Sequence, residues 1–337
     1  MATGETAYVN SVREQLLAGR ARLADVLAGG QREHVDLLLN QVDDALRRIE
    51  DGSFGICEEC HTEIGEEWLR EDPLTTVCIE HMTAKQQRAL EYDLEVAAQI
   101  QKGLLPPRDS VFPGWDVCYH YCPAGVVGGD YCDVVQDAQG ALYFVIADVS
   151  GKGVAAAMLS SNLRAVFRSL ISLGLPPGEI VTRANRLFRE SALPMQYATL
   201  ICGKASAGGE LELVNAGHPP VLVVSRDGVA QCESENPPLG LFADQVFLAS
   251  NRKLTHGETL VLYTDGISET ENDGGEEYGL ERLLRLVEQN GAACAVTLVD
   301  ACRKHVAEFR GRRERFDDET LLALQYVPVA GMSTASA

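Results

Sequence analysis

Four aspartates in the C-terminal two-thirds of the chain share one local setting, since each lies at one end of an apolar run. They are Asp130 in VVGGDYCD, Asp148 in LYFVIADVSGKG, Asp265 in TLVLYTDGISE and Asp317 in RFDDETLLAL. Short apolar runs are typical of buried strands, so each carboxylate is expected at a strand end. Sites for Mg²⁺ or Mn²⁺ need carboxylates on a rigid frame with positions open for water. The pattern therefore predicts a divalent-metal site and hydrolytic chemistry.

Two such ions can orient a water for in-line attack on phosphorus and stabilise the leaving oxygen without a protein nucleophile. Glycines beside three of the aspartates are expected to let ions and a phosphate approach the backbone; they are Gly128, Gly129, Gly151, Gly153 and Gly266. One Asp-Gly pair alone is most often a turn, but four aspartates in this setting favour a metal site. Lys152 lacks the P-loop spacing, and Ser150 lacks the G-x-S-x-G setting of a serine hydrolase.

A second group of metal-ligand residues lies earlier in the chain. Cys57-Glu-Glu-Cys60 is followed, after seventeen residues, by Cys78-Ile-Glu-His81. This spacing is typical of a tetrahedral structural zinc site, and a closed shell of three thiolates and one imidazole leaves no position for catalysis. We expect one Zn²⁺ that folds a segment too small for a core of its own. Free buried cysteines, or a redox disulfide between Cys57 and Cys60, are the alternatives.

The composition of the 337-residue chain narrows the class of protein. Its formal net charge of -20 opposes nonspecific binding to nucleic acid or to an anionic membrane, so a protein partner is expected. The N-terminal residues MATGETAYVNS lack a basic start leading into an apolar stretch, and the sequence has no apolar run of about eighteen residues. Outside the zinc pattern the cysteines are scattered through apolar segments, which suits a reducing compartment. These features predict a cytoplasmic protein.

The N-terminal third has helical periodicity. Two helices are expected over residues 5–28 and 31–51, joined at Gly29-Gly30 as a hairpin. A third is expected over residues 82–105, ended by Pro106-Pro107. A coiled-coil seam with 4-3-4-3 spacing runs along it and consists of Leu90, Leu94, Ala97, Gln101 and Leu104. The seam predicts a homodimer, and packing of this helix on the chain's own catalytic domain is the alternative.

After Pro107 the pattern changes to β-hairpins. Strands are expected near residues 115–122, 131–136, 142–149, 197–206, 210–216, 220–225, 229–232, 245–253, 258–264 and 320–327. Helices are expected near residues 153–173, 178–191, 279–290 and 294–310. Because strands form antiparallel blocks and helices come in pairs, the sequence predicts an α+β layered sandwich. The predicted domains are a helical hairpin (1–54), a zinc finger (55–81), a linker helix (82–106), a catalytic domain (107–328) and a disordered tail (329–337).

The stretch ALRRIEDGSFGICEECHTEIGEEWLREDPLTTVCIEH, residues 45–81, resembles the DksA/TraR zinc-finger family. Members of that family bind RNA polymerase through the acidic tip of a helical hairpin. This chain departs from the family twice. Its last ligand is His81 where the family usually has cysteine, and its tip LADVLAGGQREH offers only Asp25 in place of paired aspartates. The resemblance implies the zinc ion, whereas polymerase binding does not follow from it.

Eight motifs follow one another along the rest of the chain: AAQIQKGLLP, PAGVVGGDYCD, FVIADVSGKGVAAAM, YATLICG, NAGHPP, PPLGL, LVLYTDGISE and DDETLLAL. Together, over about residues 92–327, they resemble the SpoIIE/RsbU-type branch of the metal-dependent serine/threonine protein phosphatases, the PPM family. The resemblance implies an αββα sandwich with two Mn²⁺ or Mg²⁺ ions between two antiparallel sheets. It assigns metal ligation to Asp130, Asp148, Asp265 and Asp317, with Asp148 bridging and the backbone carbonyl of Val149 contributing.

Four further residues lie within these motifs. Asp318 stands where eukaryotic relatives have asparagine and is a candidate further ligand. Asp133 is expected to bind through water or to hold the loop. Cys132 stands where the family more often has an aromatic residue, and an inert packed side chain is favoured over a redox sensor. His218, in a Gly-His-Pro-Pro turn, is favoured as structural over a proton donor to the leaving oxygen.

Together these features predict a phosphoserine/phosphothreonine protein phosphatase that uses a metal-activated water. The resemblance implies a phosphorylated anti-anti-sigma (STAS-domain) protein as substrate in a partner-switching pathway, with helix 82–105 transmitting the state of the N-terminal modules. The main alternative is a non-enzymatic transcription regulator that binds RNA polymerase or another protein through its zinc-finger half. Hydrolysis of a small phosphorylated metabolite is a third possibility. Retention of all four aspartates favours an enzyme.

Overall fold

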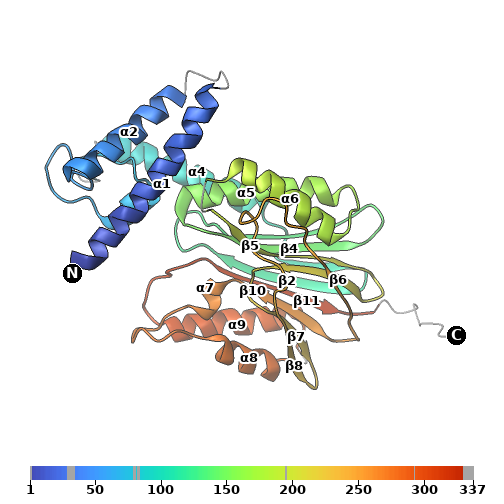
Figure 1. The fold of residues 1–337 in the computed structure, drawn as a ribbon. Helices are drawn as coiled ribbons and strands as arrows, with labels where there is room; N and C mark the ends of the chain where they lie inside the picture. Colours follow the sequence, from blue (N-terminus) through green and yellow to red (C-terminus); the bar gives the residue numbers. More distant parts are fainter. Residues whose placement is uncertain are drawn as a thin grey trace. The chain divides into compact units, whose positions relative to one another are not determined.

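The structure is a computed structural model that describes residues 2–28, 35–78, 81, 84–193, 196–291 and 293–328. These residues form two compact units, the first built mainly from residues up to Val96 and the second mainly from Ala97 onward. In Figure 1 the hairpin helices of the first unit are blue, and the sheets and helices of the second unit run from green to red.

The first unit contains the predicted helical hairpin. Helix α1 (Ala2–Ala28) packs against helix α2 (Val35–Asp51). The apolar residues buried between them lie three or four positions apart, so they share one face of each helix; they are Val12, Leu16, Val42, Ala45 and Leu46. Both predicted helices are confirmed, and their joint at Gly29-Gly30 lies outside the described residues, as does the predicted tail at 329–337.

Helix α4 (Ala84–Leu104) confirms the predicted linker helix, whose first residues, 82 and 83, lie outside the described residues. Its C-terminal end belongs to the second unit. There the side chain of Gln101 hydrogen bonds to the backbone of Gly128, and Leu104 lines a small cavity. This end of the predicted seam therefore packs on the chain's own domain.

The second unit consists of two antiparallel sheets between two layers of helices (Figure 1). One sheet has the order β1 (Asp109–Phe112), β2 (Trp115–Cys122), β11 (Glu319–Tyr326), β10 (Thr259–Tyr263), β7 (Val221–Ser225) and β8 (Gly228–Cys232). The other has the order β3 (Tyr131–Gln136), β4 (Leu142–Val149), β5 (Ala198–Ala205), β6 (Glu210–Ala216) and β9 (Ser250–Lys253). The helices are α5 (Gly153–Ile171), α6 (Pro177–Ser191), α7 (Asp265–Ser268), α8 (Leu280–Gln289) and α9 (Ala295–Arg310).

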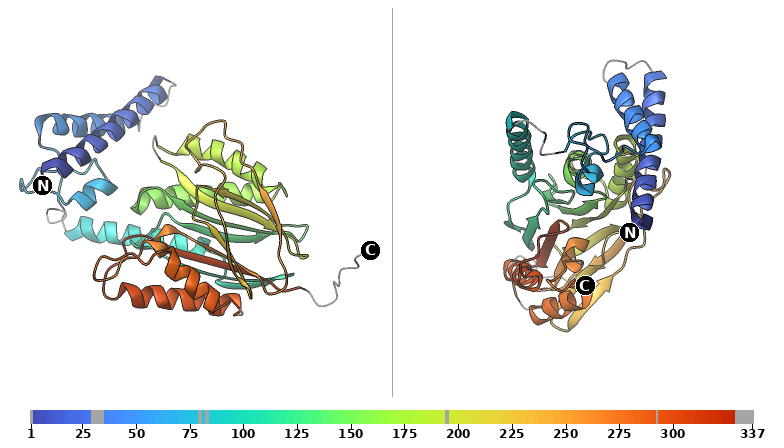
Figure 2. Two further views of the ribbon diagram at one scale, coloured as in Figure 1. Left: turned by 60° about the horizontal axis from the view of Figure 1, so that its bottom comes forward. Right: turned by 90° about the vertical axis from the view of Figure 1, so that its left-hand side faces the viewer.

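Apolar side chains hold the four layers together. Trp115, Phe144 and Leu322 are fully buried in the core between the two sheets. Helices α5 and α6 cover the five-stranded sheet, and α8 and α9 cover the six-stranded sheet (Figure 1 and Figure 2). Because β4 is covered on both faces, it is apolar over most of its length rather than alternating. The predicted αββα sandwich is confirmed.

Three elements of the second unit differ from the prediction. Only β9 is a strand within the expected 245–253, because the preceding segment packs on α6, where Phe247 is buried and its N–H donates to Thr182 Oγ1 at 3.1 Å. The edge strand β1 and the single helical turn α7 are not predicted by the sequence pattern, since both are too short to show a period.

Candidate active site

Antiparallel pairing brings two predicted aspartates together in the five-stranded sheet. Tyr131, which begins β3, pairs with Ala147 of β4. Asp130 precedes β3, so it lies beside Asp148, the next-to-last residue of β4. Burial, and then the charge of Asp148, raises the pKa of Asp130 well above its ordinary value. The two carboxylates therefore lie close enough for their charges to repel each other.

The six-stranded sheet brings the other two aspartates together. Tyr263, which ends β10, pairs with Leu321 near the beginning of β11. Asp265 begins α7 two residues after the end of β10, and Asp317 lies two residues before the beginning of β11, so the pairing of the two strands brings both to the same end of the sheet. Burial and then the charge of Asp317 raise the pKa of Asp265.

Two threonine hydroxyls connect the pairs of aspartates across the sheets. Thr264 Oγ1 donates to Asp130 Oδ2 at 2.8 Å, and Thr320 Oγ1 donates to the same oxygen. The backbone of Asp130 is held from α5, where Ser160 Oγ donates to its carbonyl at 3.1 Å. All four predicted carboxylates thus gather at one end of the sandwich, and we call them the aspartate cluster: Asp130, Asp148, Asp265 and Asp317.

The aspartate cluster carries negative charge that its surroundings do not offset. Burial, followed by the charges of Asp265 and Asp317, raises the pKa of Asp148 to about 7. In the part of the chain that the structure describes, the only cation within 4.0 Å of a cluster carboxylate is Lys152, whose Nζ lies 3.2 Å from Asp317 Oδ2. Lys152 also donates to the carbonyl of Phe316 and lies over its ring.

Buried carboxylates without paired cations are costly. Such an excess of oxygen donors and negative charge fits hard divalent cations. Each carboxylate of the cluster lies near a strand end, on a rigid frame. Of these carboxylates, only that of Asp317 forms an ion pair among the described residues, so the other three have no cation beside them. The aspartate cluster is therefore suited to Mn²⁺ or Mg²⁺.

Glycines let the segments that carry the aspartates approach one another. A Cβ on Gly129 would lie 3.0 Å from the carbonyl oxygen of Val149, the predicted backbone ligand. A Cβ on Gly266 would lie only 2.1 Å from the carbonyl oxygen of Asp318. At these two positions backbone oxygens occupy the space that a side chain would need, so close backbone packing requires glycine there. Approach of an ion or a phosphate at the predicted glycines stays a prediction.

Asp318 and Asp133 both form hydrogen bonds with protein groups. Asp318 Oδ1 accepts a hydrogen bond from Ala124 N at 2.7 Å, and its Oδ2 accepts one from Asp130 N at 3.2 Å. Asp133 is fully buried, and Arg168 donates to both of its carboxylate oxygens at 2.6 Å. Asp318 therefore holds the segment before Asp130, and Asp133 anchors β3 to α5.

His218 and Cys132 have the surroundings of structural residues. His218 is buried, its Nδ1 lies 2.8 Å from Thr199 Oγ1, and burial lowers its pKa to about 3. Its imidazole is neutral near pH 7. Burial, followed by the charges of Asp133 and Asp130, raises the pKa of the Cys132 thiol well above its ordinary value. The thiol is thus in its less reactive, protonated form.

The four predicted zinc ligands come together in the first unit. Among the described residues, Cys57, Cys60, Cys78 and His81 are the only group of three or more candidate ligands whose donor atoms all lie within 4.8 Å of one another. Cys78 Sγ lies 3.1 Å from His81 Nδ1, and none of the ten cysteines forms a disulfide. The carboxylates of the aspartate cluster are spaced more widely than this, as expected for unpaired like charges.

The zinc-ligand group also has the chemistry that Zn²⁺ requires. Burial opposes ionisation of the Cys57 thiol, but backbone N–H groups, those of Cys78 and Cys60 among them, lower its pKa to about 6. Ile64 of the loop and Leu69 of helix α3 (Glu66–Glu71) are the other buried residues beside these cysteines. So few apolar residues make a minimal core, and a thiolate-rich group fits a structural ion.

The sequence patterns do not assign Thr264, Thr320 or Gln101 to the site. The two threonines lie inside the motifs LVLYTDGISE and DDETLLAL, next to or near the predicted aspartates. Their position within those motifs is the signal that could have identified them. Gln101 was assigned to a coiled-coil seam, and its contact with Gly128 depends on a turn that the sequence pattern does not predict.

None of the described helices is both long and apolar enough to cross a membrane.

Two family profiles match the chain. The family described as "Stage II sporulation protein E (SpoIIE)" matches residues 138–327, which contain three members of the aspartate cluster. The family described as "Prokaryotic dksA/traR C4-type zinc finger" matches residues 52–80. The second match ends one residue before His81, the predicted ligand in place of the last cysteine of a C4-type finger.

Individual proteins are similar to this chain over most of its length. "Phosphoserine phosphatase RsbU" of Bacillus subtilis is 26% identical over 255 residues, which are 73% of this chain and 74% of that protein. "Protein IcfG" of Synechocystis sp. is 26% identical over 69% of this chain, and the match spans only 41% of that longer protein. The solved "SiaA-PP2C domain of Pseudomonas aeruginosa" has a TM-score of 0.64 at 20% identity and covers 73% of this chain and 100% of that domain, so it shares the fold.

Proposed function

Because this chain belongs to the SpoIIE family, we propose that it is a metal-dependent protein phosphatase that acts on phosphoserine and phosphothreonine. The observation that carries the proposal is the aspartate cluster, to which both sheets contribute carboxylates at one end of the sandwich. The similarity to a phosphoserine phosphatase over most of both chains supports it.

We assign two Mn²⁺ or Mg²⁺ ions to the aspartate cluster, with the carbonyl of Val149 as a further ligand. When bound, such ions lower the pKa of a water that attacks phosphorus and offset the charge of the phosphoryl group. Asp130 is orientated for this role by the hydroxyls of Thr264 and Thr320, which fix one of its oxygens. Asp318 accepts a hydrogen bond from the backbone N–H of Asp130. This bond helps to fix the direction in which the Asp130 carboxylate points into the site.

The substrate that we propose is a phosphorylated anti-anti-sigma protein with a STAS domain, in a cytoplasmic partner-switching pathway. The support is the resemblance of the motifs and the similarity to RsbU over 73% of the chain. Phosphopeptides and small phosphorylated metabolites should be compared as substrates, because a preference for the metabolite would contradict the protein-phosphatase assignment.

The decisive experiment is hydrolysis of a phosphoserine substrate by the full-length protein with Mn²⁺, with and without chelator, beside Asp148→Asn. Asp244→Asn, on an exposed loop, is the matched control. We expect turnover that needs Mn²⁺, disappears in Asp148→Asn and persists in Asp244→Asn. Absence of turnover together with absence of Mn²⁺ binding by calorimetry would favour the non-enzymatic regulator instead.

For the first unit we propose a regulatory role, with one structural Zn²⁺ and with α4 transmitting the state of the unit. Homodimerisation would use the Leu90–Ala97 part of the predicted seam, because Gln101 and Leu104 contact the chain's own domain. Deleting residues 1–81 should change turnover or the oligomeric state measured by light scattering. If both stay unchanged, this regulatory role is wrong.

A further inference from the structure

The side chain of Gln101 is bonded to the backbone of Gly128 through both of its polar atoms. Its Nε2 donates to the carbonyl of Gly128 at 2.7 Å, and the N–H of Gly128 donates to its Oε1 at 3.1 Å. Tyr121, from β2, also donates through its hydroxyl to the same Oε1, at 3.3 Å. An amide side chain that satisfies both backbone groups of one residue fixes that residue in position and orientation.

Gly128 lies two residues before Asp130, in a segment that joins β2 to β3 and makes no strand pairing. Asp318 and Tyr121 pack closely against it, since a Cβ added there would lie 2.3 Å from Asp318 Oδ2 and 2.5 Å from the Tyr121 hydroxyl. Asp318 binds the N–H groups of Ala124 and Asp130. Two side chains thus hold the segment that carries Asp130: Asp318, which directly precedes β11, and Gln101 of α4.

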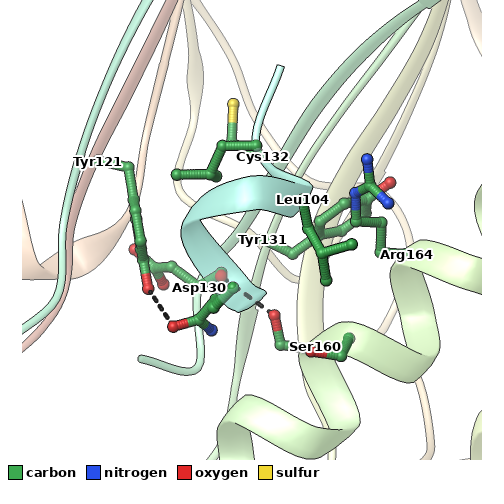
Figure 3. Close-up of a pocket in the computed structure, with 10 residues that line it drawn as sticks. Leu104, Tyr121, Asp130, Tyr131, Cys132, Ser160 and Arg164 are labelled. Carbon is green, nitrogen blue, oxygen red and sulfur yellow. Dashed lines mark hydrogen bonds between the residues drawn. The ribbon is translucent and has the colours of Figure 1, made fainter. Parts of the chain in front are cut away.

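The end of α4 fits closely against this region. The cavity that remains there is about 20 Å³, room for about one water. Leu104 of α4 lies at this cavity with Tyr121, Asp130 and Ser160 around it (Figure 3). A movement of this end of α4 would disturb these side chains, because packed interiors do not deform continuously.

We propose that Gln101 is a positioning residue for the metal centre: it fixes Gly128, and so sets Asp130 in the place where the ion binds. This inference rests on the proposed function in one respect, namely that Asp130 is a metal ligand. Release of Gln101 by displacement of α4 would loosen the segment before Asp130 and weaken metal binding. The contact therefore supplies a physical means by which α4 sets the metal affinity of the phosphatase domain.

The test is calorimetric titration of full-length protein with Mn²⁺. Gln101→Met has nearly the same volume but loses both bonds to Gly128, and Gln99→Met makes the same change at an exposed position of the same helix. We expect about tenfold weaker Mn²⁺ binding for Gln101→Met and no change for Gln99→Met. The Mn²⁺ concentration that gives half-maximal turnover should rise by the same factor, with kcat at saturating Mn²⁺ retained. The melting temperature in chelator should stay close to that of the wild type.

Tyr121→Phe is a second, milder variant that removes one donor to Gln101 and leaves Gly128 in place. We expect roughly two- to threefold weaker Mn²⁺ binding, so the inference can be tested even if Gln101→Met does not fold. Equal Mn²⁺ binding by the wild type and both variants would overturn the role of Gln101 while leaving the phosphatase intact. A large fall in the melting temperature in chelator would assign Gln101 a general structural role instead. Absence of Mn²⁺ binding by the wild type would overturn the proposed function and this role together.

Discussion

The carboxylate of Asp130 illustrates how the proposed metal centre depends on single side chains. It is buried, and the hydroxyls of Thr264 and Thr320 donate to one of its oxygens. These bonds orient the carboxylate, but they are neutral and leave its charge uncompensated. A divalent ion would be the largest local charge in such a site. Repulsion among aspartates, rather than poor packing, is therefore expected to limit the stability of the metal-free protein.

Asp148→Asn should make the chelator-treated protein more stable, although it abolishes turnover. Burial and the charges of Asp265 and Asp317 raise the pKa of Asp148 to about 7, so at pH 8 its ionised carboxylate opposes folding. Removing the charge should raise the free energy of unfolding by roughly 2 kcal/mol, less than the full pKa shift implies because solvent screens part of it. Thermal unfolding in chelator at pH 8 measures the difference. A lower melting temperature than wild type would contradict the repulsion argument.

His218 should make the protein sensitive to acid. Burial lowers the pKa of His218 to about 3 from an ordinary 6.5, and burial also lowers that of His120 to about 4. The unfolded chain therefore takes up protons that the folded chain does not. The stability from these residues is complete above pH 6.5 and is lost progressively as the pH falls towards 3.

Replacing the buried imidazole of His218 should make the free energy of unfolding depend less steeply on pH in the acid range. For His218→Asn, we expect the slope of unfolding free energy against pH, between about pH 6 and pH 5, to decrease by up to about 1.4 kcal/mol per pH unit. Urea unfolding at several pH values measures this slope. His256→Asn, at an exposed position, is the matched control and should leave the slope unchanged. An unaltered slope in His218→Asn would mean that His218 is protonated in the folded protein.

At the level of elements, a methyl group added at Gly266 should disrupt the close contact between α7 and the residues before β11. Gly266→Ala would place a Cβ 2.1 Å from the carbonyl oxygen of Asp318, a backbone atom that cannot rotate away. We expect a loss of about 1–3 kcal/mol of stability, together with weaker Mn²⁺ binding, because Asp265 and Asp317 would be pushed apart. Thermal unfolding and calorimetry measure the two effects.

The matched control for this substitution is Gly19→Ala in α1. An added Cβ there has no neighbour within 4 Å, and the residue lies inside a helix. Alanine should therefore be neutral or stabilise the protein by up to about 1 kcal/mol. A Gly266→Ala protein that kept wild-type stability and Mn²⁺ affinity would show that α7 and β11 can separate without disturbing the aspartates.

The elements that the sequence predicts well are those with long apolar or periodic patterns. Strand β4 is apolar over most of its length because both of its faces are covered, and helix α5 repeats buried residues such as Leu159, Leu163 and Phe167 at helical spacing. Segments whose conformation depends on a distant neighbour were not predictable. The segment around Phe247, expected as a strand, instead follows the surface of α6, with which it shares a hydrogen bond to Thr182.

The same distinction holds for the candidate site. The aspartate cluster could be predicted because each carboxylate stands at the end of an apolar run, a local feature. Which residues support it depends on strand register and on contacts far apart in sequence. Thr264 and Thr320 reach Asp130 only because β10 and β11 pair in one register, and Gln101 reaches Gly128 only because the chain turns back after α4. No local pattern encodes those contacts.

On the scale of the whole molecule, the chain divides into two compact units that each contain one candidate metal site. The sites differ in chemistry, since one offers thiolates and imidazole and the other offers carboxylates. Chelators and mutations can therefore address them separately. The units also differ in core size, because the first unit has two small buried clusters, one in the hairpin and one beside the zinc-ligand group, whereas the sandwich has three extensive clusters.

This difference predicts that loss of zinc unfolds part of the first unit and spares the second. Cys78→Ser should contain less than one zinc per chain by elemental analysis, because a closed site that loses one thiolate binds zinc far more weakly. Differential scanning calorimetry should then show that a lower-temperature transition of the wild type is lost or shifted down. The transition of the sandwich should keep its temperature, since Leu163, Phe144 and the other core residues of that unit do not depend on zinc. Cys232→Ser, outside the zinc-ligand group, should retain both transitions. A single transition that moves as a whole in Cys78→Ser would instead show that the two units unfold together, and that zinc stabilises the phosphatase domain itself.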